Sequence, residues 1–271
     1  MDVANGRSVN TKKAEMIDER QVVLERRGDI GCITLRRPEK RNAMTGAMRK
    51  AFGECVAAAD ADAGIRIVLL RGEGPDFCAG ADLIDAPDDA MAWRERVRAA
   101  QAHHLALVRM QKPVIAAVQG RAVGGGASIA LAADILLMAD DARLVFPFVR
   151  LGVVPDGGAS ALLQAKAGPA AALDLLLTAG SLSALDARQA GVTRRVVPAA
   201  ALRDATDTLA NELLALPAEA LMLTKALCAQ HWAAGLERVL DHEAEAFALA
   251  TTTQGHRRAI TALRETLRRQ A

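Results

Sequence analysis

Short apolar runs alternate with longer amphipathic stretches over the first two thirds of the chain. Apolar runs bounded by Gly, Pro or Asp predict strands. These runs lie at residues 22–26, 31–35, 67–70, 113–118, 134–139, 143–146 and 194–197. Apolar residues spaced three and four apart predict helices. Helices are expected at residues 46–61, with Thr45 as the N-cap, and at 91–110, 127–133, 159–167, 168–177 and 183–190.

The pattern changes towards the C-terminus. Residues 199–271 are helical in pattern throughout, with breaks expected near Pro217, Gly235 and Gly255. Strands that alternate with helices, followed by helices alone, predict an α/β core over residues 21–198 and a C-terminal helical segment over residues 199–271. Residues 1–20 are polar and of mixed charge, which predicts a disordered N-terminal tail.

One strand, one glycine turn and one helix follow each other at residues 113–133. Gly120 ends the apolar run, and Gly124, Gly125 and Gly126 precede an Ala-rich helical stretch. The bare N–H groups at such a helix start attract a negatively charged oxygen, and glycine lets a ligand approach the backbone closely. A tight turn that needs only small residues would produce the same pattern.

A second strand, at residues 67–70, also ends in a glycine-rich loop, RGEGPDFCAGAD, residues 71–82. Two such loops can converge on one carbonyl oxygen, with each loop offering one N–H. Such a pair of donors is an oxyanion hole, and each donor typically contributes about 3–4 kcal/mol in the transition state.

These segments resemble a known family. FCAGADL and KPVIAAVQGRAVGGGASIALAAD are similar to the crotonase (enoyl-CoA hydratase/isomerase) superfamily, as are RRPEKRNAM, LGVVPDGGAS and LTAGSLSALDARQAGVTRRVVP, in the family's order. The resemblance implies a spiral ββα-superhelix core and a C-terminal helical oligomerisation segment. It also implies homotrimers or dimers of trimers and an acyl-CoA thioester substrate, whose coenzyme A makes a separate cofactor unnecessary.

The resemblance also implies site residues. The oxyanion donors correspond to the backbone N–H groups of Ala81 and Gly125. The two loops that would contact the substrate contribute Ala79, Gly80, Asp82 and Gly124. In the loop before the first long helix, Lys40 and Arg41 are candidates for contacts with the coenzyme A phosphates, although a solvated basic loop would have the same composition.

The chain departs from the family where hydration of a 2-enoyl-CoA needs its two carboxylates. The corresponding positions hold Ser128 and Phe148, which would then be substrate contacts only. A serine hydroxyl is a poor acid or base near neutral pH and phenylalanine cannot ionise, so ordinary hydratase chemistry is not expected.

One acid remains nearby. Asp156 occupies the position of a catalytic aspartate in the dienoyl-CoA isomerase branch of the family, and a single carboxylate is enough to move a double bond. Burial beside Phe146 and Phe148 would raise its pKa and suit a base. Asp156 could instead serve only as the N-cap of the helix that begins near Gly158.

Three functions therefore stay open. The first is an enoyl-CoA isomerase with Asp156 as its acid and base. The second is a hydratase (lyase) with other groups, for example a water molecule held by Ser128. The third is an acyl-CoA-binding homologue without turnover. Ser128 does not lie in a GxSxG motif and the glycine run is not GxGxxG, which argues against a serine hydrolase and a dinucleotide site.

Composition excludes other classes. Lys and Arg total 34 against 32 Asp and Glu, aromatic residues make up only 3% of the chain and Tyr is absent. No basic tract is interleaved with stacking side chains, which argues against nucleic-acid binding. No apolar stretch is long enough to cross a membrane, and no Cys/His cluster predicts a metal site. Four scattered cysteines indicate reduced thiols and a cytoplasmic protein, and Cys78 is expected to be unreactive. Pathways of fatty acid metabolism and of aromatic acid degradation both stay open.

Overall fold

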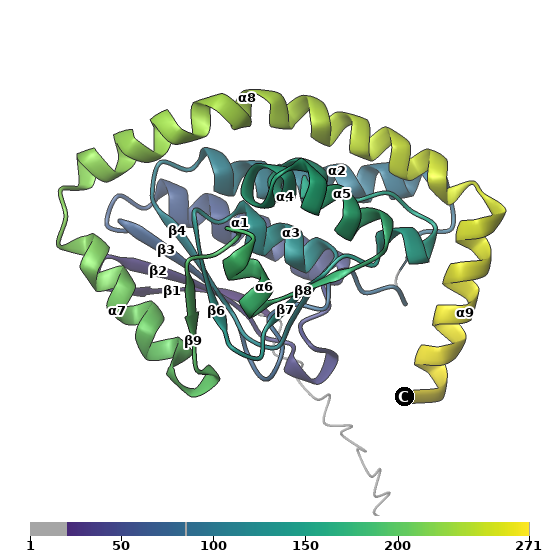
Figure 1. The fold of residues 1–271 in the computed structure, drawn as a ribbon, viewed down its shortest axis with the longest axis horizontal. Coiled ribbons are helices and arrows are strands. Elements are labelled where there is room, and N and C mark those ends of the chain that lie inside the picture. Colours follow the sequence, from purple (N-terminus) through teal and green to yellow (C-terminus); the bar gives the residue numbers. More distant parts are fainter. Residues whose placement is uncertain (1–20, 85, 271) are drawn as a thin grey trace, which may run out of the picture.

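A six-stranded sheet forms the centre of the computed structural model, which describes residues 21–84 and 86–270 (Figure 1). Its strands are β1 (Val22–Arg27), β2 (Ile30–Leu35), β3 (Ile67–Gly72), β4 (Val114–Val118), β6 (Ile135–Ala139) and β9 (Arg195–Val197). They lie in the order β1-β2-β3-β4-β6-β9, and only the β1–β2 pair is antiparallel. The predicted strands in this sheet are confirmed to within a residue or two at each end. The predicted tail, residues 1–20, lies outside the described residues.

A second, three-stranded sheet contains two strands that the sequence pattern did not indicate. Its strands are β5 (Arg121–Val123), β7 (Arg143–Val145) and β8 (Ser181–Ser183), in the order β5-β7-β8. β5 and β8 are too short to show a period of two, and they exist because β7 pairs with both of them. β5 matters for the site because it lies between Gly120 and Gly124.

The helices surround the larger sheet. They are α1 (Gly46–Ala61), α2 (Ala90–Arg109), α3 (Gly125–Ala132), α4 (Ala159–Ala167), α5 (Pro169–Leu177), α6 (Ala184–Gln189), α7 (Leu202–Leu214), α8 (Ala218–Thr251) and α9 (Gln254–Gln270). Short 3-10 helices are η1 (Pro38–Lys40), η2 (Phe148–Leu151) and η3 (Ala199–Ala201). Thr45 caps α1 as predicted, because its hydroxyl accepts a hydrogen bond from the N–H of Met48.

The expected break near Gly235 is wrong. Helix α8 continues through this glycine and arches along α2 over the top of the molecule in Figure 1. Glycine inside a helix costs only about 1 kcal/mol relative to alanine. The face of α8 that follows, with Leu236, Leu240, Ala244 and Phe247 buried in the core, outweighs that cost.

Both faces of the larger sheet are covered. Residues Leu209 and Ala210 of α7 pack with Cys32, Ile67, Leu69 and Ile115 on one face. The larger apolar cluster, which includes parts of α1, α2 and α3, covers the other face. Because β3 and β4 are parallel neighbours, the loops that follow them leave the sheet at the same edge. This arrangement brings the two glycine-rich loops together.

A buried lysine fixes the C-terminal helix to the core. The Lys225 Nζ atom of α8 donates to the Leu107 carbonyl at 3.2 Å, the Lys112 carbonyl at 2.9 Å and the Asp134 carboxylate at 2.7 Å. Asp134 also accepts a hydrogen bond from the N–H of Val114 at 2.7 Å. The ion pair therefore joins α8 to the end of α2 and to the start of β4, so Asp134 has a structural role.

We expect Lys225→Met to lower the free energy of unfolding by about 3–5 kcal/mol, because it leaves the Asp134 carboxylate buried without its cation. Replacing both partners, with Lys225→Met and Asp134→Leu, should cost clearly less than the sum of the two single changes. Urea unfolding of the four proteins at one protein concentration measures the coupling. Additive losses would contradict a direct interaction between the two side chains.

Candidate active site

Backbone pairing joins the two glycine-rich loops. The N–H of Cys78 donates to the carbonyl of Arg121 at 3.1 Å, and the N–H of Val123 donates to the carbonyl of Cys78 at 2.9 Å. On its other side the first loop pairs with Met44, whose N–H donates to Gly80 and whose carbonyl accepts from Asp82. These bonds hold the chain on both sides of Ala81 without using the N–H of Ala81 itself.

The loops approach so closely that glycine is required. A Cβ atom on Gly80 would lie 2.5 Å from the carbonyl oxygen of Val123 and 3.6 Å from the backbone nitrogen of Gly125. Gly125 is the first residue of α3, and the first N–H groups of a helix have no acceptor within it. The predicted oxyanion donors, Ala81 and Gly125, thus lie beside each other and line one pocket.

That pocket also contains Asp156. Apolar side chains of Met44, Phe52 and Ile129 form part of its wall, together with Ala81, Gly125 and Asp156. The Asp156 Oδ1 atom lies 3.9 Å from where a Cβ on Gly125 would be. Two N–H donors and one carboxylate around a largely apolar space can hold a carbonyl oxygen and exchange a proton on a neighbouring carbon.

The carboxyl group of Asp156 has the properties of a base near neutral pH. Its Oδ1 atom is buried and has no hydrogen-bond partner among the residues that the structure describes. Burial raises the pKa of Asp156 to about 6, although the charges of Arg49 and Arg96 act in the opposite direction. The interpretation of Asp156 as a helix N-cap is wrong, because Gly158 occupies the N-cap position of α4.

Glu243 of α8 binds the start of α4 instead. Its carboxylate accepts from the N–H of Gly158 at 2.7 Å, from the N–H of Ser160 at 3.3 Å and from the hydroxyl of Ser160 at 2.6 Å. Burial raises the pKa of Glu243 to about 7, and the negative charge of Asp156 contributes to the increase. Sequence reasoning missed this residue. The available signal was a carboxylate on the apolar face of a helix, between Leu240 and Phe247.

His104 of α2 holds the other side of the Asp156 turn. Its Nδ1 atom lies 3.0 Å from the carbonyl oxygen of Gly157, and because a carbonyl only accepts, this nitrogen carries the proton. Burial lowers the pKa of His104 to about 4, so the ring is neutral at pH 7. A Cβ on Gly157 would lie 2.4 Å from this ring, so the turn needs glycine for His104 to contact it.

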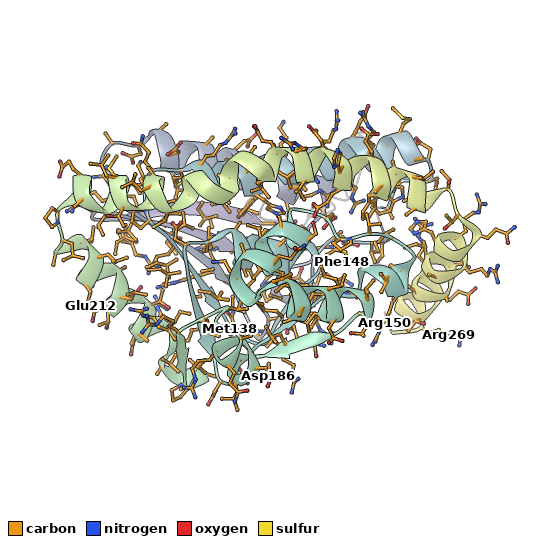
Figure 2. All side chains as sticks on the ribbon, turned by 45° about the horizontal axis from the view of Figure 1, so that its top comes forward. Met138, Phe148, Arg150, Asp186, Glu212 and Arg269 are labelled. Atoms are coloured by element: carbon orange, nitrogen blue, oxygen red, sulfur yellow. The ribbon has the colours of Figure 1, made fainter. Side chains whose placement is uncertain are left out.

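Ser128 and Phe148 lie close to residues of the site. The Ser128 hydroxyl is fully buried and donates to the carbonyl oxygen of Asp156 at 2.9 Å. The ring of Phe148 lies 3.7 Å from where a Cβ on Gly124 would be. Figure 2 shows Phe148 and Arg150 on the same short segment, η2; Phe148 is buried, whereas Arg150 is exposed.

The remaining predicted site residues lie in the first loop and at η1. The Asp82 carboxylate accepts from Arg37 at 2.7 Å and from the N–H of Ile84, so this side chain stabilises its own loop. The N–H of Ala79 donates to the carbonyl of Arg41. The side chains of Lys40 and Arg41 are exposed, and Arg41 lies 3.7 Å from Asp76.

Other chemistries find no support in the described part of the chain. Cys78 is fully buried, and burial raises the pKa of its thiol to about 12, so it is not a nucleophile at neutral pH. In residues 21–84 and 86–270, no three His, Cys, Asp or Glu side chains gather as a metal site would require. No helix in that same part of the chain has the length and apolar character needed to cross a membrane.

Comparison with known proteins shows which family the chain is similar to. The sequence profile of the family described as enoyl-CoA hydratase/isomerase matches residues 25–270. A 1,2-epoxyphenylacetyl-CoA isomerase from Escherichia coli K12 is 37% identical over 238 residues, which cover 85% of this chain and 90% of that protein. A crotonyl-CoA hydratase from Syntrophomonas wolfei is 30% identical over 246 residues, covering 90% of this chain and 95% of the relative.

Solved structures show the same fold. An enoyl-CoA hydratase from Mycobacterium avium subsp. paratuberculosis superposes with a TM-score of 0.84 at 27% identity, covering 91% of this chain and 96% of that one. A Thermobifida fusca structure in complex with acetoacetyl-CoA superposes with a TM-score of 0.74 at 34% identity, covering 83% and 94%. The predicted crotonase-like α/β core with a C-terminal helical segment is confirmed.

We expect Gly80→Ala to disrupt this site. The new Cβ would clash with the Val123 carbonyl, and the backbone at Gly80 has φ +84°, which an alanine rarely adopts. The loop must therefore move, and the free energy of unfolding should fall by about 2–4 kcal/mol. Calorimetric titration with acetoacetyl-CoA should show binding at least tenfold weaker.

Gly191→Ala is the matched control. Gly191 has nearly the same φ, +81°, but a Cβ there would meet its nearest atom, the Lys166 carbonyl oxygen, at 3.5 Å. This variant should lose only about 1 kcal/mol and bind acetoacetyl-CoA normally. If both variants bound the thioester alike, the close approach at Gly80 would have no role in binding.

Proposed function

Since the chain belongs to the enoyl-CoA hydratase/isomerase family, the crotonase superfamily, we propose that it is an enoyl-CoA double-bond isomerase whose acid and base is Asp156. The observation that carries the proposal is the position of one carboxylate. Asp156 has a buried Oδ1 atom without a hydrogen-bond partner in the described chain, beside Gly125, in a pocket that also includes Ala81.

The reaction follows from this arrangement. The thioester carbonyl of a 3-enoyl-CoA accepts hydrogen bonds from the N–H groups of Ala81 and Gly125. The ionised carboxylate of Asp156 removes a proton from C2, and the electron pair spreads into a dienolate whose oxygen carries the negative charge. The same carboxyl group then returns the proton to C4, and the double bond moves from C3–C4 to C2–C3. The donors favour the enolate over the neutral thioester, which lowers the barrier.

The residues around Asp156 favour isomerisation over hydration. Hydration needs a group that activates water, yet Ser128 donates its hydroxyl to a backbone carbonyl and Phe148 is apolar. Glu243 accepts hydrogen bonds from α4 rather than lining the pocket. The relatives include an isomerase and hydratases, so their names favour neither reaction.

The proposal also includes the substrate class, the oligomeric state and the location of the enzyme. The substrate is an acyl-CoA thioester, as the relative bound to acetoacetyl-CoA supports, and coenzyme A enters as part of it, so no further cofactor is proposed. The exposed side chains of Lys40 and Arg41 would contact its phosphates. We propose a homotrimer or a dimer of trimers, and a cytoplasmic location in keeping with four free cysteines.

Asp156→Asn tests the base directly. It keeps the size of the side chain but cannot accept a proton at C2, so kcat for 3-hexenoyl-CoA should fall by about 10²–10⁴-fold while thioester binding is retained. The reaction is followed in heavy water by mass spectrometry. The wild type should produce an isomer with deuterium on carbon and no added water. Unchanged turnover in the variant would exclude Asp156 as the base.

The products separate the alternatives. A wild-type product heavier by one water would indicate a hydratase, and bound but unchanged substrate would indicate a homologue without turnover.

The stability of Asp156→Asn provides the control for folding. Because burial raises the pKa of Asp156 to about 6, the folded protein holds the neutral carboxyl group more readily than the unfolded chain does. This contribution to the free energy of unfolding is complete below about pH 4 and is lost as the pH rises through 6. Asparagine has no charge at any pH, so the variant should be more stable than the wild type by about 1–3 kcal/mol at pH 8 and equally stable below pH 4.

The pH profile identifies which carboxyl group acts. Removal of the C2 proton needs ionised Asp156, so kcat/KM should rise with pH through about 6 and be lost below it. Glu243→Gln should retain this rise, since the glutamine oxygen can still accept from the N–H of Gly158. A profile that lost its ascending limb in Glu243→Gln would make Glu243 the base instead.

A further inference from the structure

We infer that Glu243 is a positioning residue: by binding the first N–H groups of α4 from α8, it keeps the carboxyl group of Asp156 out of the helix cap and open to the substrate. This inference rests on the proposed function, because it concerns the base of the same reaction. Asp156 lacks the hydrogen bond that its position in the sequence favours.

An aspartate commonly accepts a hydrogen bond from the backbone N–H two residues later. Two other aspartates of the described chain do so. The Asp62 carboxylate accepts from the N–H of Gly64 at 2.8 Å, and the Asp82 carboxylate accepts from the N–H two residues later at 3.1 Å. Asp156 likewise has a glycine, Gly158, two residues later. The same turn is therefore expected at Asp156.

The N–H of Gly158 has a different acceptor. It donates to the Glu243 carboxylate at 2.7 Å, and the same carboxylate accepts from the N–H and the hydroxyl of Ser160. A carboxylate is favoured at a helix N-terminus, because the first N–H groups have no acceptor within the helix and the helix dipole is positive there. The Oδ1 atom of Asp156 is left buried, without a partner in the described chain. The start of α4 thus binds Glu243 in place of Asp156.

Glu243 is held in place from α2 as well. The Gln101 side-chain amide donates to the Glu243 carboxylate at 3.4 Å and to the carbonyl of Leu240 at 2.8 Å. Gln101 and Glu243 are both buried. A side chain that packing and a neighbouring amide already restrain loses little further entropy when it accepts from α4. Glu243 therefore competes well with the Asp156 carboxylate for the same donors.

An Asp156 side chain that capped α4 would be a weaker base. N–H groups that donate to a carboxylate favour its ionised form and lower its pKa. The carboxyl group would also turn towards α4 and away from the pocket that it shares with Ala81 and Gly125. Both changes oppose removal of a C2 proton, because proton transfer needs a base of suitable strength within reach of the carbon. Glu243 prevents both changes from outside the pocket.

Charged groups lie on several sides of Asp156. Arg49 of α1 and Arg96 of α2 act to lower its pKa, and the negative charge of Asp156 helps to raise the pKa of Glu243. His104 of α2 is neutral at pH 7. A change at Glu243 can therefore act through charge or through hydrogen bonding. Glu243→Gln removes the charge and keeps an acceptor for α4, whereas Glu243→Leu removes both.

NMR of protein labelled with carbon-13 aspartate measures the pKa of Asp156 directly, and Asp156→Asn assigns the signal. The pKa should be about 6 in the wild type. It should stay within about half a pH unit of that value in Glu243→Gln and fall by about one to two pH units in Glu243→Leu, where Asp156 is expected to cap α4. A wild-type pKa at or below the ordinary value of about 4 would overturn the inference without any variant, because Asp156 would then already be hydrogen-bonded.

Turnover of 3-hexenoyl-CoA gives a second measurement. In Glu243→Leu kcat should fall by about 10- to 100-fold, and the ascending limb of kcat/KM should move to lower pH together with the pKa of Asp156. The dissociation constant of saturated hexanoyl-CoA should change by less than about threefold. Glu243→Gln should restore most of the turnover. A merely structural role would instead weaken thioester binding and leave the limb in place, which would contradict the inference.

Glu245→Leu is the matched control. Glu245 lies two residues later on α8, but its side chain is 55% exposed and pairs with Arg94 and Arg98 of α2. This variant should keep the wild-type turnover and the wild-type pKa of Asp156. If Glu243→Leu matched Glu243→Gln in both measurements, the cap of α4 would have no influence on Asp156 and the inference would be wrong.

The two proposals can fail separately. If the pKa of Asp156 falls in Glu243→Leu but Asp156→Asn keeps full turnover, Glu243 positions Asp156 and another group is the base. If Asp156→Asn loses turnover as expected but Glu243→Leu changes neither the pKa of Asp156 nor kcat, Asp156 remains the base and Glu243 only stabilises α4.

Discussion

The close approach of two backbone loops is the constraint on which the site depends. Gly80 faces the carbonyl of Val123, and Gly126 faces the carbonyl of Cys78; a Cβ on either glycine would lie 2.5 Å from that oxygen. The loops can meet because β3 and β4 are parallel neighbours with both faces of their sheet covered. The close approach fixes the backbone N–H groups of Ala81 and Gly125, the predicted oxyanion donors, without the help of a side chain.

A second arrangement leaves the carboxyl group of Asp156 facing the pocket. The start of α4 needs hydrogen-bond acceptors, and a carboxylate two residues before Gly158 is well placed to provide one. Glu243 provides it instead, from a helix far along the chain, while Ser128 and His104 bind the carbonyls of Asp156 and Gly157. The backbone around Asp156 is thus held from three sides, and its carboxyl group faces the pocket without a structural task.

Local patterns predicted most of the fold, and distant contacts explain what they missed. Strand periods, the Thr45 cap and the glycine runs are readable because each depends on a few neighbouring residues. The strand β5 depends on pairing with β7, and the continuity of α8 through Gly235 depends on core packing beyond it. Glu243, Arg49 and Arg96 were missed for the same reason. Each reaches the site from a helix whose exposed and buried faces look ordinary in sequence, and only the packing of α1, α2 and α8 brings them to Asp156.

Burial and charge act in opposite directions on Asp156. Burial makes the ionised form of its carboxyl group unfavourable, whereas Arg49 and Arg96 favour it, and the balance places its pKa at about 6. In the proposed reaction, a bound acyl group that excludes water from the pocket would raise this pKa further. A more basic carboxylate removes the weakly acidic C2 proton more readily. Filling of the pocket by the acyl group and proton transfer at C2 would then depend on the same buried carboxyl group.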